Sequence, residues 1–324
     1  MNDHSPLDSK VLLNAFRKRA DLAADPDTNA YRLFNGFCEG CRDLSVDRYA
    51  ETAVIQWMQK RCEADEDEKK QLAECCLRNV PGVENVLFKN RYAKIADEKK
   101  GIMLAGKDPA RTIREWGVPY PLDLRLNKDC GFYLDSALLR RWLLRNAAGK
   151  RVLNTFAYTG SLGDAAEAGH ALSVTQTDLN RNYLRARHSS QEYIFGDFFH
   201  VAASLRRSER SFDIILLDPP FFANAGRSAR VNQESNSAAL VNKIRPLAAD
   251  GGKIVVVNNA LFLSGKDFLA QLQTLSGEYL SLGEIIPVPD SFIGGSSTDS
   301  ELLPADPAPF NHPTKIIVLD IRRK

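Results

Sequence analysis

The apolar run FDIILLDPPFF, residues 212–222, ends in residues that could hold a planar nitrogen. Proline has no N–H to donate to a β-ladder, so a strand over Ile214–Leu217 must stop at the acid. The carboxylate and the two proline carbonyls then accept hydrogen bonds, and an aromatic ring stands beside them. We expect this candidate catalytic group to consist of Asp218, Pro219, Pro220 and Phe221. Taken without its neighbours, the run is also typical of a plain strand followed by a rigid turn.

Polar residues follow each of the neighbouring predicted strands as well. Strands alternate with helical stretches five times after residue 150, which is typical of a parallel, doubly wound sheet. The carboxyl ends of parallel strands share one edge of such a sheet, where ligands bind. We therefore predict a site lined by the polar residues at those ends: Asn154, Asp178, Asp197, Asp218, Asn258 and Asn259.

Strands and helices in strict alternation must position these residues. The predicted strands cover Arg151–Phe156, Ala171–Gln176, Glu192–Phe195, Ile214–Leu217 and Lys253–Val257. The predicted helices cover the small residues up to Ala168, a stretch from Asn180, and Ser237–Leu247. Before them, an aromatic loop runs into a helix within Gly131–Asn146, whose leucines and tryptophan form an apolar stripe.

The turn after the first of these strands can be compared with three kinds of nucleotide-binding turn. A P-loop is excluded, because Gly149-Lys150 and Gly265-Lys266 are followed by Arg and Asp in place of the required Ser or Thr. A dinucleotide fold needs three glycines, and the turn offers only Gly160 and Gly163. S-adenosylmethionine, which has no phosphates, needs a tight turn, an acid for the ribose and a polar group for the adenine. Gly160, Asp178 and Asp197 favour this cofactor, although Asp178 taken alone is equally typical of a helix N-cap.

Five motifs in order, GFYLD, VLNTFAYTGSLG, QTDLNR, GDFF and LDPPFF, resemble class I methyltransferases of bacterial large-subunit rRNA. The similarity is to the cytosine carbon-5 enzymes and to the guanine nitrogen-7 methyltransferase domain. AYRLFNG and LSVDRY also resemble the central domain of the cytosine enzymes, so the likeness extends from about Asn29 to the end. It implies an α/β fold with a Rossmann-like seven-stranded sheet. The last two strands would cover Leu282–Val288 and Lys315–Ile321, the final one antiparallel.

The same resemblance implies which residues line the cofactor site. At the methionine end it places Phe132, Tyr133, Asp135, Asn154, Phe156, Tyr158 and Gly160. The predicted cofactor set is completed by Thr159, Ser161, Asp178, Asp197, Phe198 and Asp218.

One departure from the cytosine enzymes concerns the chemistry. Those enzymes need a cysteine after the fifth strand, because carbon 5 of cytosine becomes nucleophilic only after a thiolate adds to the ring. Here the stretch reads VVVNNALFLSG, without cysteine, which favours direct transfer to a base nitrogen. We expect Asp218 and the Pro219 carbonyl to hold that nitrogen in line with the methyl group. Asn258 and Asn259 would bridge the fourth and fifth strands, unless they only cap the sheet.

RNA, an rRNA-like target, is the expected partner, but two other functions stay open. An acid followed by two prolines offers hydrogen-bond acceptors to any planar nitrogen group, so the substrate could also be a protein amide or a small-molecule amine. The chain could also be a non-catalytic module that keeps the cofactor pocket. With 43 basic and 41 acidic residues the net charge is +2, so RNA contacts would need local basic patches.

The length of 324 residues suits two domains, which we place at 1–110 and 111–324. The first would be a small α+β domain and the second the methyltransferase domain. The sequence shows neither a membrane-length apolar run nor a signal pattern, so we expect a cytoplasmic protein without membrane association. The oligomeric state is open, and a homodimer is compatible with the sequence.

The N-terminal domain shows no acid–base or nucleophilic constellation. Its predicted elements are an amphipathic helix within Val11–Leu22, a hairpin or small sheet within Asn29–Met58, a helix near 72–80, a strand at Val83–Phe88, and loops from Asp97 to Pro109. Cys38 and Cys41 have metal or redox spacing, but no matching second pair follows, so free thiols and no metal are favoured. A further loop is predicted at 291–309, which is rich in Gly, Ser and Pro.

Overall fold

The computed structural model describes residues 9–58, 64–184, 190–220, 233–261, 263–277, 279–293, 310 and 312–323. These residues divide into two compact units. The first ends at Leu134 and takes in the segment that begins at Pro289. The second begins at Asp135 and contains the C-terminal strand.

A five-stranded sheet forms the first unit, in the order β1-β2-β3-β4-β5. Its elements are α1 (Ser9–Lys18), α2 (Ala20–Ala24), β1 (Ala30–Asn35), β2 (Leu44–Tyr49), β3 (Thr52–Trp57), α3 (Glu66–Asn79), β4 (Asn85–Asn90), α4 (Ala96–Lys100) and β5 (Ile102–Ala105). A hairpin of β6 (Thr112–Glu115) and β7 (Val118–Pro121) follows. The predicted small sheet and strand 83–88 are confirmed. The loops predicted from Asp97 to Pro109 are wrong, because this polar stretch contains α4 and the edge strand β5.

The division between the units lies at residue 134, later than the predicted 110. The β6–β7 hairpin is bonded to the start of β1, since Asn29 and Arg114 exchange hydrogen bonds of 2.9 and 2.7 Å. The buried Lys89 ammonium donates to the carbonyls of Leu124, Asn127 and Asp129 at 2.6–2.9 Å. Residues 111–130 are therefore held to the first unit by contacts that composition does not reveal.

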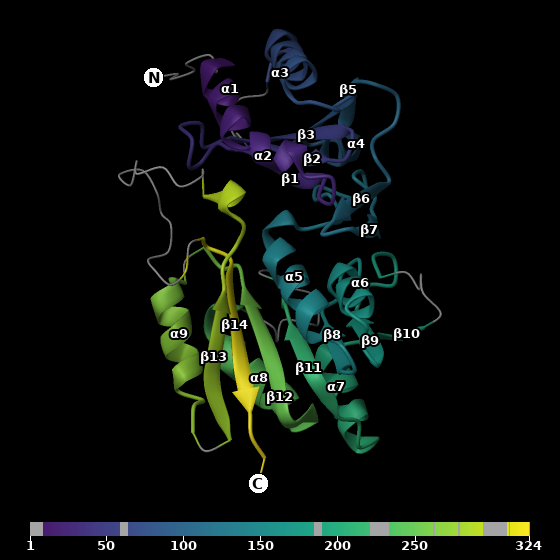
Figure 1. Cartoon of the computed structure of the whole chain (residues 1–324), viewed down its shortest axis with the longest axis vertical. Helices are drawn as coiled ribbons and strands as arrows, with labels where there is room; N and C mark the ends of the chain where they lie inside the picture. Colours follow the sequence, from purple (N-terminus) through teal and green to yellow (C-terminus); the bar gives the residue numbers. More distant parts are fainter. Residues whose placement is uncertain are drawn as a thin grey trace. The chain divides into compact units, whose positions relative to one another are not determined.

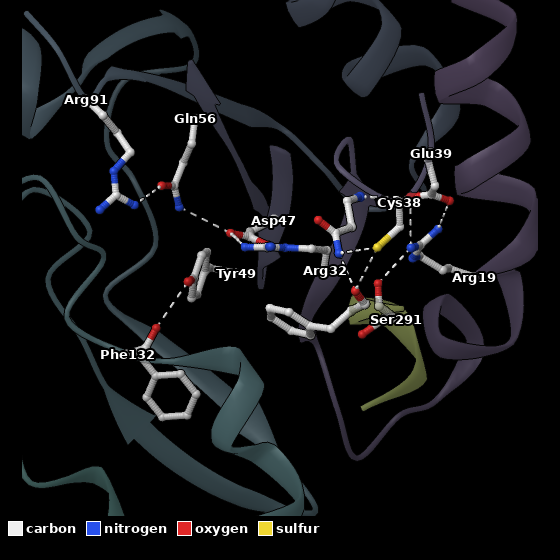
Figure 2. A network of polar contacts seen from close by, with 12 residues as sticks. Arg19, Arg32, Cys38, Glu39, Asp47, Tyr49, Gln56, Arg91, Phe132 and Ser291 are labelled. Carbon is white, nitrogen blue, oxygen red and sulfur yellow. Dashed lines mark hydrogen bonds and ion pairs between the residues drawn. The ribbon is translucent and has the colours of Figure 1, made fainter. Parts of the chain in front are cut away.

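A polar network fixes the segment at 289–293 within the first unit (Figure 2). Arg19 is almost fully buried, and its guanidinium donates to both Glu39 oxygens and to the Ser291 carbonyl, at 2.7–3.0 Å. The Cys38 thiol donates to the Phe292 carbonyl at 3.7 Å, and Arg32 lies over the Phe292 ring. The start of the predicted 291–309 loop is thus the buried 3₁₀ turn η3 (Asp290–Phe292), and residues 294–309 lie outside the described part.

The second unit is built on a seven-stranded sheet in the order β10-β9-β8-β11-β12-β14-β13 (Figure 1). Its helices are η1 (Leu134–Ser136, which starts in the first unit), α5 (Ala137–Asn146), α6 (Ser161–Ala168), α7 (Phe198–Arg207), α8 (Gln233–Ile244), η2 (Arg245–Leu247) and α9 (Gly265–Gln273). Its strands are β8 (Arg151–Thr155), β9 (Ser173–Asp178), β10 (Gln191–Phe195), β11 (Phe212–Leu217), β12 (Ala248–Asn258), β13 (Leu280–Ile286) and β14 (Lys315–Ile321).

Strands β8 to β12 are parallel, and β14 runs antiparallel to β12 and β13. The predicted Rossmann-like sheet of seven strands and its antiparallel last strand are confirmed. One apolar face of the sheet packs with residues of α7, α8 and α9 in a single core. Alternate residues point to the opposite face, which α6 covers, since Gly163 of α6 meets the Gln176 side chain of β9.

Two predicted boundaries in this unit shift. The second strand starts at Ser173 and reaches Asp178, so the acid ends the strand rather than following it. Residues 181–184 form a turn instead of opening the helix predicted from Asn180, and 185–189 lie outside the described residues. None of the described helices combines the length and apolar character that spanning a bilayer requires.

Candidate active site

The ends of the parallel strands meet at one edge of the seven-stranded sheet. Because β8 lies between β9 and β11, the turn after β8 stands at the centre of that edge. Asp178 ends β9, Asp218 follows β11, and Asn258 ends β12. The predicted row of polar strand ends therefore shares one edge.

The turn after β8 has an unusual backbone. Phe156, Tyr158 and Gly160 have φ values of +55°, +52° and +92°. Only glycine adopts this left-handed region without strain, and non-glycine residues held there cluster at ligand sites. The Ala157 N–H donates to the Thr177 carbonyl at 2.9 Å, which holds the turn against the end of β9. Thr159 is half-buried in the turn, and Ser161 begins α6.

Asp178 ties this turn to the end of the second strand. One carboxylate oxygen accepts the Tyr158 N–H at 2.8 Å and the other accepts the Asn180 N–H at 2.7 Å. Burial raises the pKa of Asp178, although these backbone hydrogen bonds oppose the shift. The Leu179 N–H also bonds to this carboxylate. Since a carboxylate has about four lone-pair sites, the acid can still accept a hydroxyl hydrogen from a ribose.

A chain of buried amides crosses the three strands under the turn. Asn154 of β8 donates to Gln176 of β9 at 2.9 Å, and Gln176 donates to Gln191 of β10 at 2.6 Å. The Oδ1 atom of Asn154 is buried and has no hydrogen-bond partner among the described residues. A buried acceptor without a partner, next to the strained turn, can bind a ligand that donates a hydrogen bond.

Asp197 and two phenylalanines stand after the third strand. Asp197 caps α7, accepting the N–H groups of Phe199 and His200 at 3.0 and 3.3 Å. Phe198 is buried and its ring stacks on Phe156 with centroids 4.9 Å apart. The structure thus links the turn after β8 to the start of α7 through these stacked rings.

Asp218 is half-buried directly after β11, with Pro219 buried and Pro220 exposed behind it. Burial and the negative charge of Asp135 raise the pKa of Asp218 to about 7. Asp135 is itself held at this edge, because the Thr314 hydroxyl donates to its Oδ2 atom at 2.8 Å. Phe221 lies outside the described residues.

The two asparagines after β12 differ. Asn258 is fully buried, and its Oδ1 accepts the Ala260 N–H at 2.9 Å while its amide donates to Ser237 at 3.4 Å. Asn259 is exposed. Asn258 therefore shapes the turn after β12 and connects it to α8.

Two predicted cofactor residues belong to the first unit. Phe132 is buried there, and its carbonyl accepts the Tyr49 hydroxyl at 3.2 Å (Figure 2). Its ring packs on Tyr120. Tyr133 is exposed. Their assignment to the cofactor stays a prediction.

Sequence reasoning missed the residues that open β14. An antiparallel strand begins where its parallel neighbours end, so Thr314 and Lys315 stand at the site edge. Lys315 is fully buried, pairs with Asn258 in the sheet and donates to the carbonyls of Ala260 and Leu263 at 2.9 and 2.5 Å. The expected antiparallel direction of this strand was the signal that could have placed them.

These residues fit an adenosyl cofactor. The turn at 156–160 brings backbone to the edge, Asp178 offers carboxylate lone pairs for hydroxyls, and Asn154 offers an unpaired acceptor. Asp135 and Asp218 supply negative charge for a group carrying an ammonium and a sulfonium.

Comparison with known proteins identifies the family. A family model described as S-adenosylmethionine-dependent methyltransferase matches residues 84–293. A Bacillus subtilis protein named as a ribosomal RNA large subunit methyltransferase, YwbD, is 31% identical over 82% of this chain and 71% of its own length. The ribosomal RNA large subunit methyltransferase K/L of Hahella chejuensis is 27% identical over 74% of this chain, which spans only 35% of that protein.

A solved structure agrees in fold. The crystal structure of SMU.776 complexed with SAH superposes with a TM-score of 0.80 at 22% identity, over 98% of this chain and 83% of that one. Together with the strand order, the strained turn and the acids at the sheet edge, these matches show that the chain belongs to the S-adenosylmethionine-dependent methyltransferase family.

Proposed function

We propose that this enzyme methylates a base nitrogen of RNA, an rRNA-like target, by direct in-line transfer. The observation that carries the proposal is the position of Asp218, which follows β11 at the sheet edge, beside the strained turn after β8. Its raised pKa of about 7 is consistent with a proton acceptor at neutral pH. The names of the relatives, which are ribosomal RNA methyltransferases, support RNA as the substrate class.

Nitrogen transfer needs no covalent intermediate on the protein. S-adenosylmethionine supplies a methyl group on a sulfonium with its own leaving group. Asp218 and the Pro219 carbonyl hold the acceptor nitrogen so that its lone pair faces the methyl carbon. As the N–C bond forms and the S–C bond breaks, an exocyclic amine would lose its proton to Asp218. The turn after β12, residues 258–263, contains no cysteine that could add to a cytosine ring.

The other residues of the edge hold the reactants in this proposal. Asp178 binds the ribose, the turn at 156–161 binds the methionine moiety, and Asp197 with Phe198 lies on the adenine side. Asn258 and Asn259 keep the end of β12 in place beside Asp218, and Phe221 stacks on the base.

Replacing the acid tests the proposal. Asp218→Ala should reduce methyl transfer to RNA at least a hundredfold, because both the acceptor and the positioning contact are lost. Calorimetry should still detect binding of S-adenosylhomocysteine to the variant, so that the loss lies in methyl transfer and not in cofactor loading. Nucleoside mass spectrometry of RNA treated with the wild-type enzyme identifies the methylated atom. Undiminished turnover of the variant, or methyl on a carbon atom, would contradict the assignment.

A protein amide or a small amine is the second candidate substrate. The Asp218 carboxylate and the Pro219 carbonyl could accept hydrogen bonds from any planar nitrogen group. The net charge of +2 does not by itself favour RNA. Competition by rRNA fragments distinguishes the two, because only an RNA-binding enzyme is inhibited by unmethylated RNA in a salt-sensitive way.

A further inference from the structure

The first residues of β14 hold a charged group at the methyl-transfer edge. Thr314 is 7% exposed, and its hydroxyl donates to Oδ2 of Asp135 at 2.8 Å. In the sheet, Lys315 pairs with Asn258 of β12, and Leu217 of β11 pairs with Val256 of β12. Asp218 is therefore level with Val257 and Thr314 is level with Asn259, so the two stand on either side of the end of β12, about 12 Å apart.

The Asp135 carboxylate lies at the same edge, since it accepts the hydrogen bond from Thr314 and its charge raises the pKa of Asp218. The negative charge of Asp135 disfavours loss of the proton from Asp218, and a cation bound between the two side chains would relieve this repulsion. The methionine moiety of the cofactor carries such a cation, its ammonium group.

We propose that Thr314 is a positioning residue: it holds Asp135 so that the cofactor ammonium binds beside both carboxylates, and its arrival releases the proton of Asp218. The fraction of enzyme with an ionised proton acceptor would then increase when the methyl donor is loaded. This inference rests on the proposed role of Asp218, but it concerns cofactor binding and needs no RNA.

Among the residues that the structure describes, no other charged group near Asp218 provides this cation. The Lys315 ammonium donates hydrogen bonds to the carbonyls of Ala260 and Leu263. On the β8 side the strand ends in the uncharged Asn154 and Thr155, and β12 ends in Asn258. His312 lies next to Thr314 and accepts its backbone N–H at 3.0 Å, so its own titration must be separated experimentally.

Calorimetry measures the released proton directly. S-adenosylhomocysteine, which keeps the ammonium, is titrated into the full chain at pH 7 in buffers of different ionisation enthalpy. Because Asp218 is about half protonated at its pKa of about 7, we expect about half a proton released per cofactor bound. The release should approach zero at pH 8.5, where the acid is already ionised. Asp218→Asn provides the baseline from the cofactor's own amino group, and His312→Gln must leave the release unchanged.

Two substitutions at one position test the role of Thr314. Thr314→Val removes the donor at nearly the same volume and should raise the Kd at least fivefold while lowering the released proton to less than half of the wild-type value. Thr314→Ser keeps the hydroxyl and should restore both. Circular dichroism confirms that each variant is folded.

Three outcomes would overturn the inference: wild-type enthalpies that do not depend on the buffer, a Thr314→Val enzyme with wild-type release, or no cofactor binding. If RNA is not the substrate, cofactor binding would still release the proton while RNA stayed unmethylated, so the two failures can be distinguished.

Discussion

Asp218 must be ionised to accept a proton, yet the fold makes ionisation unfavourable. Burial and the charge of Asp135 raise its pKa to about 7, whereas an aspartate in an unfolded chain titrates near 4. The folded protein thus holds a proton that the unfolded chain releases between these values. The stability associated with this proton is complete below pH 4 and is lost as the pH rises through 7.

We predict that Asp218→Asn stabilises the protein at neutral and higher pH while it inactivates the enzyme. Three pKa units correspond to about 4 kcal/mol, and partial exposure of the carboxylate reduces the expected gain to about 2 kcal/mol. Urea unfolding at pH 4.5, 6 and 8 measures the difference, which should grow with pH and level off above 7.

Asp213→Asn is the matched control of opposite sign. Hydrogen bonds from Arg151, at 2.8–3.0 Å, lower the pKa of Asp213. The wild-type protein should therefore be more stable than Asp213→Asn at pH 6 and 8, and the difference should shrink as the pH falls below 4. Equal pH profiles for the two variants would contradict the raised pKa of Asp218.

At the scale of elements, the sequence predicts most of what the sheet needs. Apolar runs such as Ile214–Leu217 locate strands buried on both faces, and the double proline fixes where β11 stops. The alternation of strands and helices then places the acids on one edge. These signals depend on residues that are close together in the sequence, so they can be interpreted without knowing the fold.

Contacts between strands could not be predicted in the same way. Gln176 and Gln191 resemble surface residues in sequence, but both are buried and bonded to each other between β9 and β10. Thr314 and Asp135 are 179 positions apart, and only the antiparallel placement of β14 joins them. Such pairs depend on the order of strands, which composition and periodicity do not determine.

The packing of α6 on β9 gives a prediction at this scale. A Cβ on Gly163 would lie 2.3–2.6 Å from the end of the Gln176 side chain, which cannot move freely because Asn154 and Gln191 bond it on both sides. Gly163→Ala should therefore cost about 1–3 kcal/mol of stability and weaken cofactor binding through the shifted Asn154. Thermal unfolding and calorimetry with S-adenosylhomocysteine measure the two effects.

Gly277→Ala is the control for this substitution. A Cβ at Gly277 meets nothing within 4 Å, so stability should change by less than about 0.5 kcal/mol. If both variants behaved alike, the amide chain across β8, β9 and β10 would not depend on the close approach of α6.

At the scale of the whole molecule, the chain is less simply divided than its composition suggests. The stretch from 111 to 134 belongs to the first unit because Lys89 and Asn29 bind it, and the segment at 289–293 returns to that unit between β13 and β14. Arg19 and Cys38 donate to backbone carbonyls of this segment, and Arg32 lies over the Phe292 ring. Because the polar contacts are made to the backbone, the sequence of the segment contains no motif that predicts them.

The substrate class is best decided by salt, because the chain has nearly balanced charge. RNA binding by even three lysine or arginine contacts to phosphates should give a log–log slope of about −2, since each phosphate of a single strand contributes about −0.7. Between 50 and 200 mM salt the affinity for an rRNA fragment would then fall about sixteenfold, measured by fluorescence anisotropy. A protein amide or a small amine involves no such counterion release and should give a slope near zero. The Kd for S-adenosylhomocysteine, measured over the same salt series, should stay nearly constant and so exclude unfolding as the cause. A flat RNA curve beside a flat cofactor curve would reject RNA as the substrate while leaving the methyltransferase site intact.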